Sequence, residues 1–66
     1  MIVKQLDSSA LTEARFDEVN GDMTIVFVDG AEHTYPEMDR DIFVALVEAK
    51  SPGRFFNLNI RGRFGQ

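Results

Sequence analysis

The sequence predicts an α+β fold in which a three- to four-stranded antiparallel β-meander packs against one main α-helix and a short C-terminal helical segment. Two signals for tight turns, Asn20-Gly21 and Asp29-Gly30, interrupt the apolar and β-branched first half of the chain. After Asp39 the apolar residues recur at helical spacing instead. A chain of 66 residues forms at most one domain, which we place over residues 1–66.

Four short segments are expected to form the strands: residues 2–6, 10–16, 23–28 and 31–35. In the second segment the side chains alternate between two faces, which places Leu11 opposite Ala14 and Phe16. The third segment is β-branched, aromatic and apolar on nearly both faces, so we expect it to be a central strand. Pro36 has no backbone N–H, so it ends the fourth strand or marks that strand as an edge.

Two helical segments are expected, over residues 39–50 and 51–61. Asp39 should cap the first helix, and Lys50 should lie at its negative C-terminal end. One apolar stripe on this helix should lie on the sheet; it is formed by Ile42, Phe43, Leu46 and Val47. Ser51-Pro52 is typical of a fresh helix start, and Gly62 is the predicted stop of the second helix.

Charge is distributed unevenly along the chain. All eleven acidic residues lie in the first 48 positions, whereas residues 49–66 carry only basic charges, on Lys50, Arg54, Arg61 and Arg63. The net charge of −4 argues against nonspecific attraction to DNA or anionic membranes, so any nucleic-acid contact must be local. The basic segment also contains aromatic residues, and arginine pairs with phosphate while an aromatic face can take a base.

The first candidate site lies on the second helix. Helical spacing places Arg54, Asn57 and Arg61 on one polar face, where they could contact phosphate or an acidic partner. Phe56 should face the core, which leaves Phe55 as the candidate for stacking on a base. The alternative interpretation is structural: the arginines form a solvated face, and both phenylalanines belong to the core.

A second candidate site lies on the fourth strand, where His33 and Tyr35 share one face because side chains alternate. Exposed together, the two rings would form a small aromatic shelf able to make hydrogen bonds. Buried, they would form a core layer, and we expect at least one ring to be buried. His33 is the only side chain whose ordinary titration range lies near neutrality.

Several classes of function are excluded or disfavoured. The chain has no cysteine and one histidine, so we expect no disulfide, no metal site and no cofactor. It has no nucleophile elbow and no glycine-rich phosphate loop, so we expect no enzymatic activity. No stretch approaches the roughly 20 apolar residues that span a bilayer, so we expect no membrane association and a cytoplasmic location.

A set of short motifs occurs in a recognisable order: Asp7-Ser8-Ser9, Gly30, His33-Thr34-Tyr35, Ala49-x-Ser51-x-Gly53, Phe55-Phe56-Asn57 and Ile60-Arg61. Together they resemble the KTSC domain family over residues 3–64. The family is named for its occurrence at the C-terminus of some lysyl-tRNA synthetases, and it also occurs as free-standing small bacterial proteins. The resemblance implies no established biochemical activity, and the synthetase context suggests RNA binding. Two positions depart from the family pattern: His33 stands in place of a tyrosine, and Asp39 in place of a proline.

Two functions follow as hypotheses. In the first, the chain is a small non-enzymatic module that binds RNA or another nucleic acid through Arg54, Phe55, Asn57 and Arg61, with the rings of His33 and Tyr35 as a further surface. In the second, it is a protein-interaction module, self-associating or acting as a small inhibitor, that uses an acidic face of the sheet.

Overall fold

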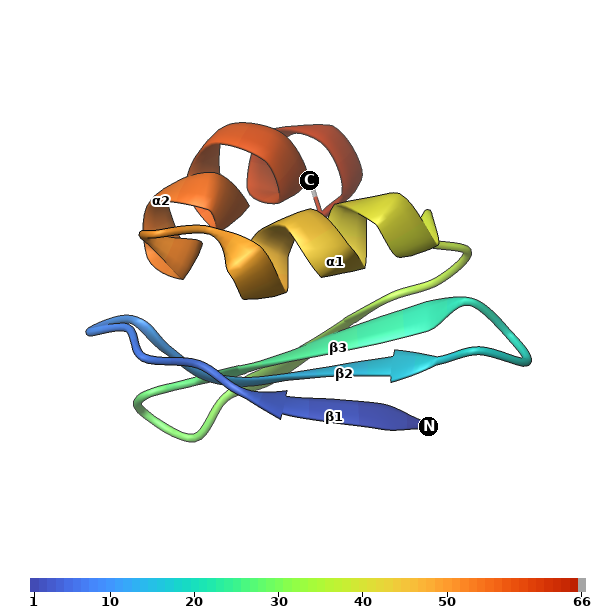
Figure 1. The fold of residues 1–66 in the computed structure, drawn as a ribbon, viewed down its shortest axis with the longest axis horizontal. Helices are drawn as coiled ribbons and strands as arrows, with labels where there is room; N and C mark the ends of the chain where they lie inside the picture. Colours follow the sequence, from blue (N-terminus) through green and yellow to red (C-terminus); the bar gives the residue numbers. More distant parts are fainter. Residues whose placement is uncertain (66) are drawn as a thin grey trace.

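The protein forms two layers, a four-stranded sheet with all the described helices on one of its faces (Figure 1). The structure, a computed structural model, describes the backbone of residues 1–65 and the side chains of residues 1–61. The sheet order is β1-β2-β3-β4, and every neighbouring pair is antiparallel. The strands are β1 (Ile2–Gln5), β2 (Leu11–Asp17), β3 (Asp22–Phe27) and β4 (Glu32–Tyr35). The predicted α+β meander is therefore confirmed, with four strands.

The turn between β3 and β4 forms where Asp29-Gly30 predicts it. Gly30 has a φ of 94°, which a residue without Cβ adopts at little cost. The backbone N–H of Gly30 donates to the Phe27 carbonyl at 2.9 Å, and the Asp29 carboxylate accepts from the Ala31 N–H at 2.9 Å. The side chain of Asp29 thus holds the turn from which β4 returns along β3.

β2 departs from the predicted alternation. Leu11 pairs with Phe27, whereas Glu13 pairs with Val26, so Thr12 is an extra residue in a β-bulge. The bulge moves Leu11 to the same face as Ala14 and Phe16, where all three are buried. The prediction that Leu11 lies opposite these two residues is wrong, because strict alternation does not allow for an inserted residue.

Helix α1 (Arg40–Glu48) lies across the sheet, as its apolar stripe predicts. Asp39 is the N-cap, and its carboxylate accepts from the Asp41 N–H at 2.9 Å. Lys50 was expected at the end of this helix, but the chain turns extended at Ala49, so Lys50 lies beyond the helix. The core between the layers consists of Leu11, Ala14, Phe16, Met23, Ile25, Tyr35, Met38, Phe43, Leu46, Phe56 and Ile60.

The C-terminal helical segment changes its geometry part-way. Helix α2 (Pro52–Phe56) begins at Ser51-Pro52 as predicted, and it continues directly into the π-helical segment η1 (Asn57–Gly65). The Asn59 side chain donates to the Phe55 carbonyl at 3.3 Å, and such side-chain competition for carbonyls distorts helices. The predicted stop at Gly62 is wrong, since the helical backbone continues to Gly65. Arg63 lies outside the residues whose side chains the structure describes.

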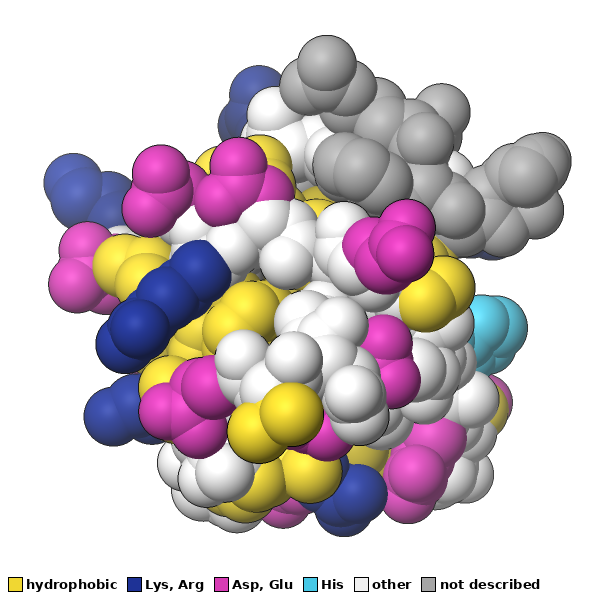
Figure 2. Space-filling view, turned by 90° about the vertical axis from the view of Figure 1, so that its right-hand side faces the viewer, with side chains coloured by type: hydrophobic (Ala, Val, Ile, Leu, Met, Phe, Trp, Pro, Cys, Tyr) yellow, Lys and Arg dark blue, Asp and Glu magenta, His cyan; other side chains and the backbone are white. Residues whose placement is uncertain are grey.

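The outer face of the sheet is uncovered by the described helices. By strand register it carries four carboxylates and one arginine: Glu13, Asp17, Asp22, Glu32 and Arg15. Arg15 pairs with Glu13, and one of its guanidinium nitrogens lies 3.9 Å from Glu32. Figure 2 shows that acidic side chains are dispersed over the end of the molecule that carries the β2–β3 turn, with the histidine at one edge.

Candidate functional site

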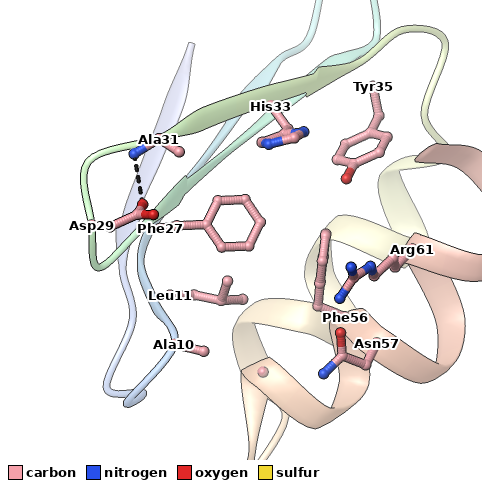
Figure 3. A pocket seen from close by; sticks show the side chains of 11 residues that line it. Ala10, Leu11, Phe27, Asp29, Ala31, His33, Tyr35, Phe56, Asn57 and Arg61 are labelled. Atoms are coloured by element: carbon pink, nitrogen blue, oxygen red, sulfur yellow. Dashed lines mark hydrogen bonds between the residues drawn. The ribbon is translucent and has the colours of Figure 1, made fainter. Parts of the chain in front are cut away.

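A groove of about 610 Å³ opens between the end of the β3–β4 hairpin and the C-terminal helical segment (Figure 3). Its volume lies within the range of small-molecule and cofactor sites. The sheet side contributes Leu11, Phe27, Asp29, Ala31, His33 and Tyr35, together with Ala10 before β2. The helical side contributes Gly53, Phe56, Asn57 and Arg61. The groove therefore joins two segments of the chain that are far apart in the sequence.

Four aromatic rings, which we call the aromatic quartet, form a continuous series along the groove: His33, Phe27, Phe56 and Tyr35. The ring centroids of His33 and Phe27 are 5.2 Å apart, those of Phe27 and Phe56 are 5.4 Å apart, and those of Phe56 and Tyr35 are 6.0 Å apart. All three pairs are edge-to-face, the arrangement that the ring quadrupoles favour. Phe56 and Tyr35 are buried, Phe27 is half-buried and His33 is exposed. The quartet thus runs from the core to the surface.

Arg61 and Asn57 lie on the helical side of the groove, across from β4 (Figure 3). Both side chains are exposed. Burial raises the pKa of the Tyr35 phenol, and the positive charge of Arg61 acts in the opposite direction. Arg61 lies across the groove from Tyr35 (Figure 3), and among the described residues that line the groove it is the only arginine or lysine.

Among the described residues that line the groove, Asp29 supplies the one carboxylate, at the hairpin end. Arg61 and Asp29 come from different sides of the groove, with the aromatic quartet between the two sides (Figure 3). The groove is therefore bipolar: an aromatic middle separates a hydrogen-bond acceptor from a cation. Such a site suits a ligand that is planar in one part and anionic in another.

A close approach between α2 and the loop before β2 closes one end of the groove. A Cβ added at Gly53 would lie 3.3 Å from the Ala10 Cβ and 3.4 Å from the Ser8 Oγ. The Ser8 hydroxyl in turn accepts from the backbone N–H groups of Ala10 and Leu11, at 3.1 and 3.3 Å. Ser8 and Gly53 therefore serve the architecture: one shapes the loop, and the other lets the helix reach it.

The structure brings four of the six predicted site residues together and separates the other two. His33, Tyr35, Asn57 and Arg61 line the groove. Arg54 is exposed but lies outside the lining set, so the predicted stripe of Arg54, Asn57 and Arg61 is not formed as a unit. A π-helix advances by a smaller angle per residue than an α-helix, because its hydrogen bonds span five residues. The change at Asn57 therefore rotates Arg61 away from Arg54.

The second separated residue is Phe55, which was the predicted stacking ring. It is half-buried against the core and does not line the groove. The predicted core position of Phe56 is confirmed, and so is the burial of at least one ring of the His33/Tyr35 pair. Sequence reasoning missed Phe27 and Asp29 as groove residues. Hairpin register around Gly30 was the available signal, since it sets both residues beside the start of β4.

The comparison with known families agrees with the resemblance drawn from the sequence. The sequence model of the KTSC domain matches residues 7–64 of this chain. The chain belongs to the KTSC domain family. A KTSC domain protein from Yersinia pestis, whose crystal structure is known, is similar with a TM-score of 0.88 and 25% identity, over 96% of this chain and 89% of that one. A protein from Tsukamurella paurometabola is 32% identical over 62 residues, which is 94% of this chain and 92% of its relative.

Several of the motifs that carry the resemblance contribute residues to the groove of this KTSC domain. Tyr35 comes from His33-Thr34-Tyr35, and Gly53 comes from Ala49-x-Ser51-x-Gly53. Phe56 and Asn57 come from Phe55-Phe56-Asn57, and Arg61 comes from Ile60-Arg61. All five residues line the groove. Within the described residues, no three His, Asp or Glu side chains gather in a way that could hold a metal ion. In the same part of the chain, no helix has the length and apolar character needed to cross a bilayer.

Proposed function

We propose that this KTSC domain is a binding module, without catalytic activity, that holds single-stranded RNA in the groove. Arg61 binds a backbone phosphate, since a guanidinium matches phosphate in a bidentate geometry. The exposed ring of His33, packed against Phe27, provides the surface on which one base stacks. The Asn57 side chain offers both a donor and an acceptor to the same nucleotide.

One observation carries the proposal: the aromatic quartet and the Arg61 guanidinium line the same groove. Single-stranded nucleic acid is bound by this combination of stacking surface and phosphate-binding cation. The exposed His33 ring and the half-buried Phe27 ring offer the aromatic surface, and both come from the β3–β4 hairpin rather than from the C-terminal segment. The overall negative charge of the protein makes the local cation at Arg61 decisive for an anionic ligand.

The test is a titration of fluorescently labelled single-stranded RNA of mixed sequence, at low and at moderate salt. In wild-type protein we expect saturable binding that weakens with salt. Arg61→Gln should weaken binding by about 10- to 100-fold, as expected for loss of a charge-assisted hydrogen bond. It should also reduce the slope of log affinity against log salt by about 0.7, the contribution of one phosphate in a single strand.

Arg54→Gln is the matched control, because it removes the same charge from the same helical segment but outside the groove. It should weaken binding by less than about threefold, since an exposed charge acts only through the screened long-range field. Equal effects of the two substitutions would show that the groove is not the binding site. Absence of RNA binding at low salt would contradict the proposed function itself.

The outer sheet face supports a second candidate function, binding of a basic protein partner. Four carboxylates against one arginine give this uncovered face a net negative charge. Self-association through it would oppose like charges, so a basic partner fits it better than a second copy. Sedimentation over a wide concentration range separates these cases, and a concentration-dependent dimer would contradict the charge argument.

A further inference from the structure

We infer that the groove prefers guanine as the base it holds, and that the Asp29 carboxylate provides this preference. The inference rests on the proposed function and names the base that the same site takes. Asp29 takes part in neither phosphate binding nor stacking, and it is an acid in a groove proposed to bind an anion.

The carboxylate of Asp29 takes part in the hairpin turn. One of its oxygens accepts from the Ala31 backbone N–H at 2.9 Å, which ties the side chain to the hairpin turn (Figure 3). An ionised carboxylate has two oxygens with about four acceptor sites, so further donors can still be bound. The ion pairs between described side chains join Arg15 to Glu13 and Glu32, and none of them includes Asp29. Asp29 is also exposed, so its free acceptor sites are reachable from the groove.

The four RNA bases differ in what they present to such an acceptor. The Watson–Crick edge of guanine carries two adjacent donors, the ring N1–H and the exocyclic amine, which match the two carboxylate oxygens. Adenine and cytosine present one amine beside a ring-nitrogen acceptor, and uracil presents one N–H between two carbonyls. In these three bases an acceptor faces the carboxylate and opposes binding. Unpaired bases are read in this way on their Watson–Crick edges.

The order of groups along the groove suits one nucleotide. Ala31, whose backbone N–H donates to Asp29, precedes β4, and Tyr35, which lies across the groove from Arg61 (Figure 3), ends it. These two residues are four positions apart, or about 13 Å at the rise of a strand. His33 lies between them in the sequence and shares its face of the strand with Tyr35. A guanine edge at Asp29, its ring on His33 and its phosphate at Arg61 therefore follow the groove from one end to the other.

The experiment uses four seven-nucleotide RNAs with uridine at every position but the central one. The central nucleotide is G, A, C or U, so the fourth RNA is all uridine. We expect the G-containing RNA to bind the wild-type protein about 5- to 100-fold more tightly than the others, the discrimination typical of a bidentate pair. Asp29→Asn should abolish this preference while the all-uridine RNA still binds. The asparagine oxygen can keep the Ala31 contact, so the turn is retained, but the amide places a donor where guanine needs an acceptor.

Glu32→Gln is the control, since it removes the same charge from a nearby residue on the outer face. It should leave the preference for guanine unchanged. Binding of all four RNAs with similar affinity, or a preference that survives in Asp29→Asn, overturns the assignment of guanine and leaves RNA binding intact. Failure of every RNA to bind overturns the proposed function and this inference together.

Discussion

Phe56 lies at the centre of the aromatic quartet, and replacing it with leucine tests how much the edge-to-face contacts stabilise the fold. The ring of Phe56 contacts Phe27 at 5.4 Å and Tyr35 at 6.0 Å, and only 4% of the residue is exposed. Leucine keeps the apolar character but removes both aromatic contacts. Each such contact is worth about 0.5–1.5 kcal/mol, so Phe56→Leu should lower the free energy of unfolding by about 1–3 kcal/mol.

The total stability sets the scale of this loss. At about 0.05–0.15 kcal/mol per residue, a 66-residue protein has roughly 3–10 kcal/mol. Phe56→Leu should therefore fold but unfold at a lower urea concentration than the wild type. Phe56→Ala, with an expected loss of about 3–5 kcal/mol, should leave little or no free energy of unfolding. In urea, followed by circular dichroism, an m value of about 1 kcal/mol/M gives a midpoint shift of about 1–3 M for Phe56→Leu.

Phe55→Leu is the control for this measurement. Phe55 is a half-buried neighbour on the same helix, and within the described residues no aromatic pair includes it. A change of similar volume there should cost less than about 1 kcal/mol. If Phe55→Leu shifts the midpoint as much as Phe56→Leu does, the edge-to-face contacts are not what stabilises the groove wall.

Three further predictions concern the surroundings of the groove and the acid stability of the fold. Arg61→Gln should raise the pKa of Tyr35 further above its ordinary value of 10.0, because the neighbouring positive charge is lost. Tyr35 is the single tyrosine of the chain, so ultraviolet absorbance against pH measures this pKa. An unchanged pKa would contradict the proximity of Arg61 to Tyr35. Hydrogen bonds from the following turn hold the pKa of Asp17 below 3.8. This carboxylate therefore stabilises the fold above its unfolded-state pKa, and the contribution is lost as the pH falls through the lower folded-state value. Asp17→Asn should make the stability of the fold less dependent on pH below about pH 4. An acid-unfolding curve identical to that of the wild type would show that Asp17 makes no such contribution. Gly53→Val should lower the free energy of unfolding in urea by roughly 1–3 kcal/mol, because the new side chain would contact Ser8 and the loop before β2. An unchanged free energy of unfolding would show that the loop moves to make room for the side chain.

Features set by a few neighbouring residues could be predicted from the sequence. The turn at Gly30, the cap at Asp39 and the helix start at Pro52 each depend on local chemistry, and the structure has all three. The bulge at Thr12 could not be predicted in this way, because it depends on pairing with a distant strand. The Thr12 hydroxyl donates to the Val26 carbonyl at 3.2 Å, a contact that alternation alone does not reveal.

The candidate site was predictable in its parts but not in its assembly. Period-two alternation correctly placed His33 and Tyr35 on one face, but only helix packing determines that Tyr35 is buried while His33 is exposed. The grouping of Arg54 with Arg61 assumed a regular α-helix, and the π-helical turn breaks it. No local sequence pattern predicts that the C-terminal helical segment lies across the groove from β4, because tertiary packing determines this arrangement.

The buried half of the aromatic quartet has a thermodynamic consequence for this small domain. Phe56 and Tyr35 belong to the hydrophobic core and also line the groove, so the binding surface exists only while the core is packed. Occupancy of the groove and folding are therefore linked equilibria. A ligand present at 100 times its dissociation constant would add about 2.7 kcal/mol to the free energy of unfolding, a large fraction of what so short a chain has. The melting temperature of the domain is thus a label-free sensor for its ligand, and it can screen candidates before any affinity is known.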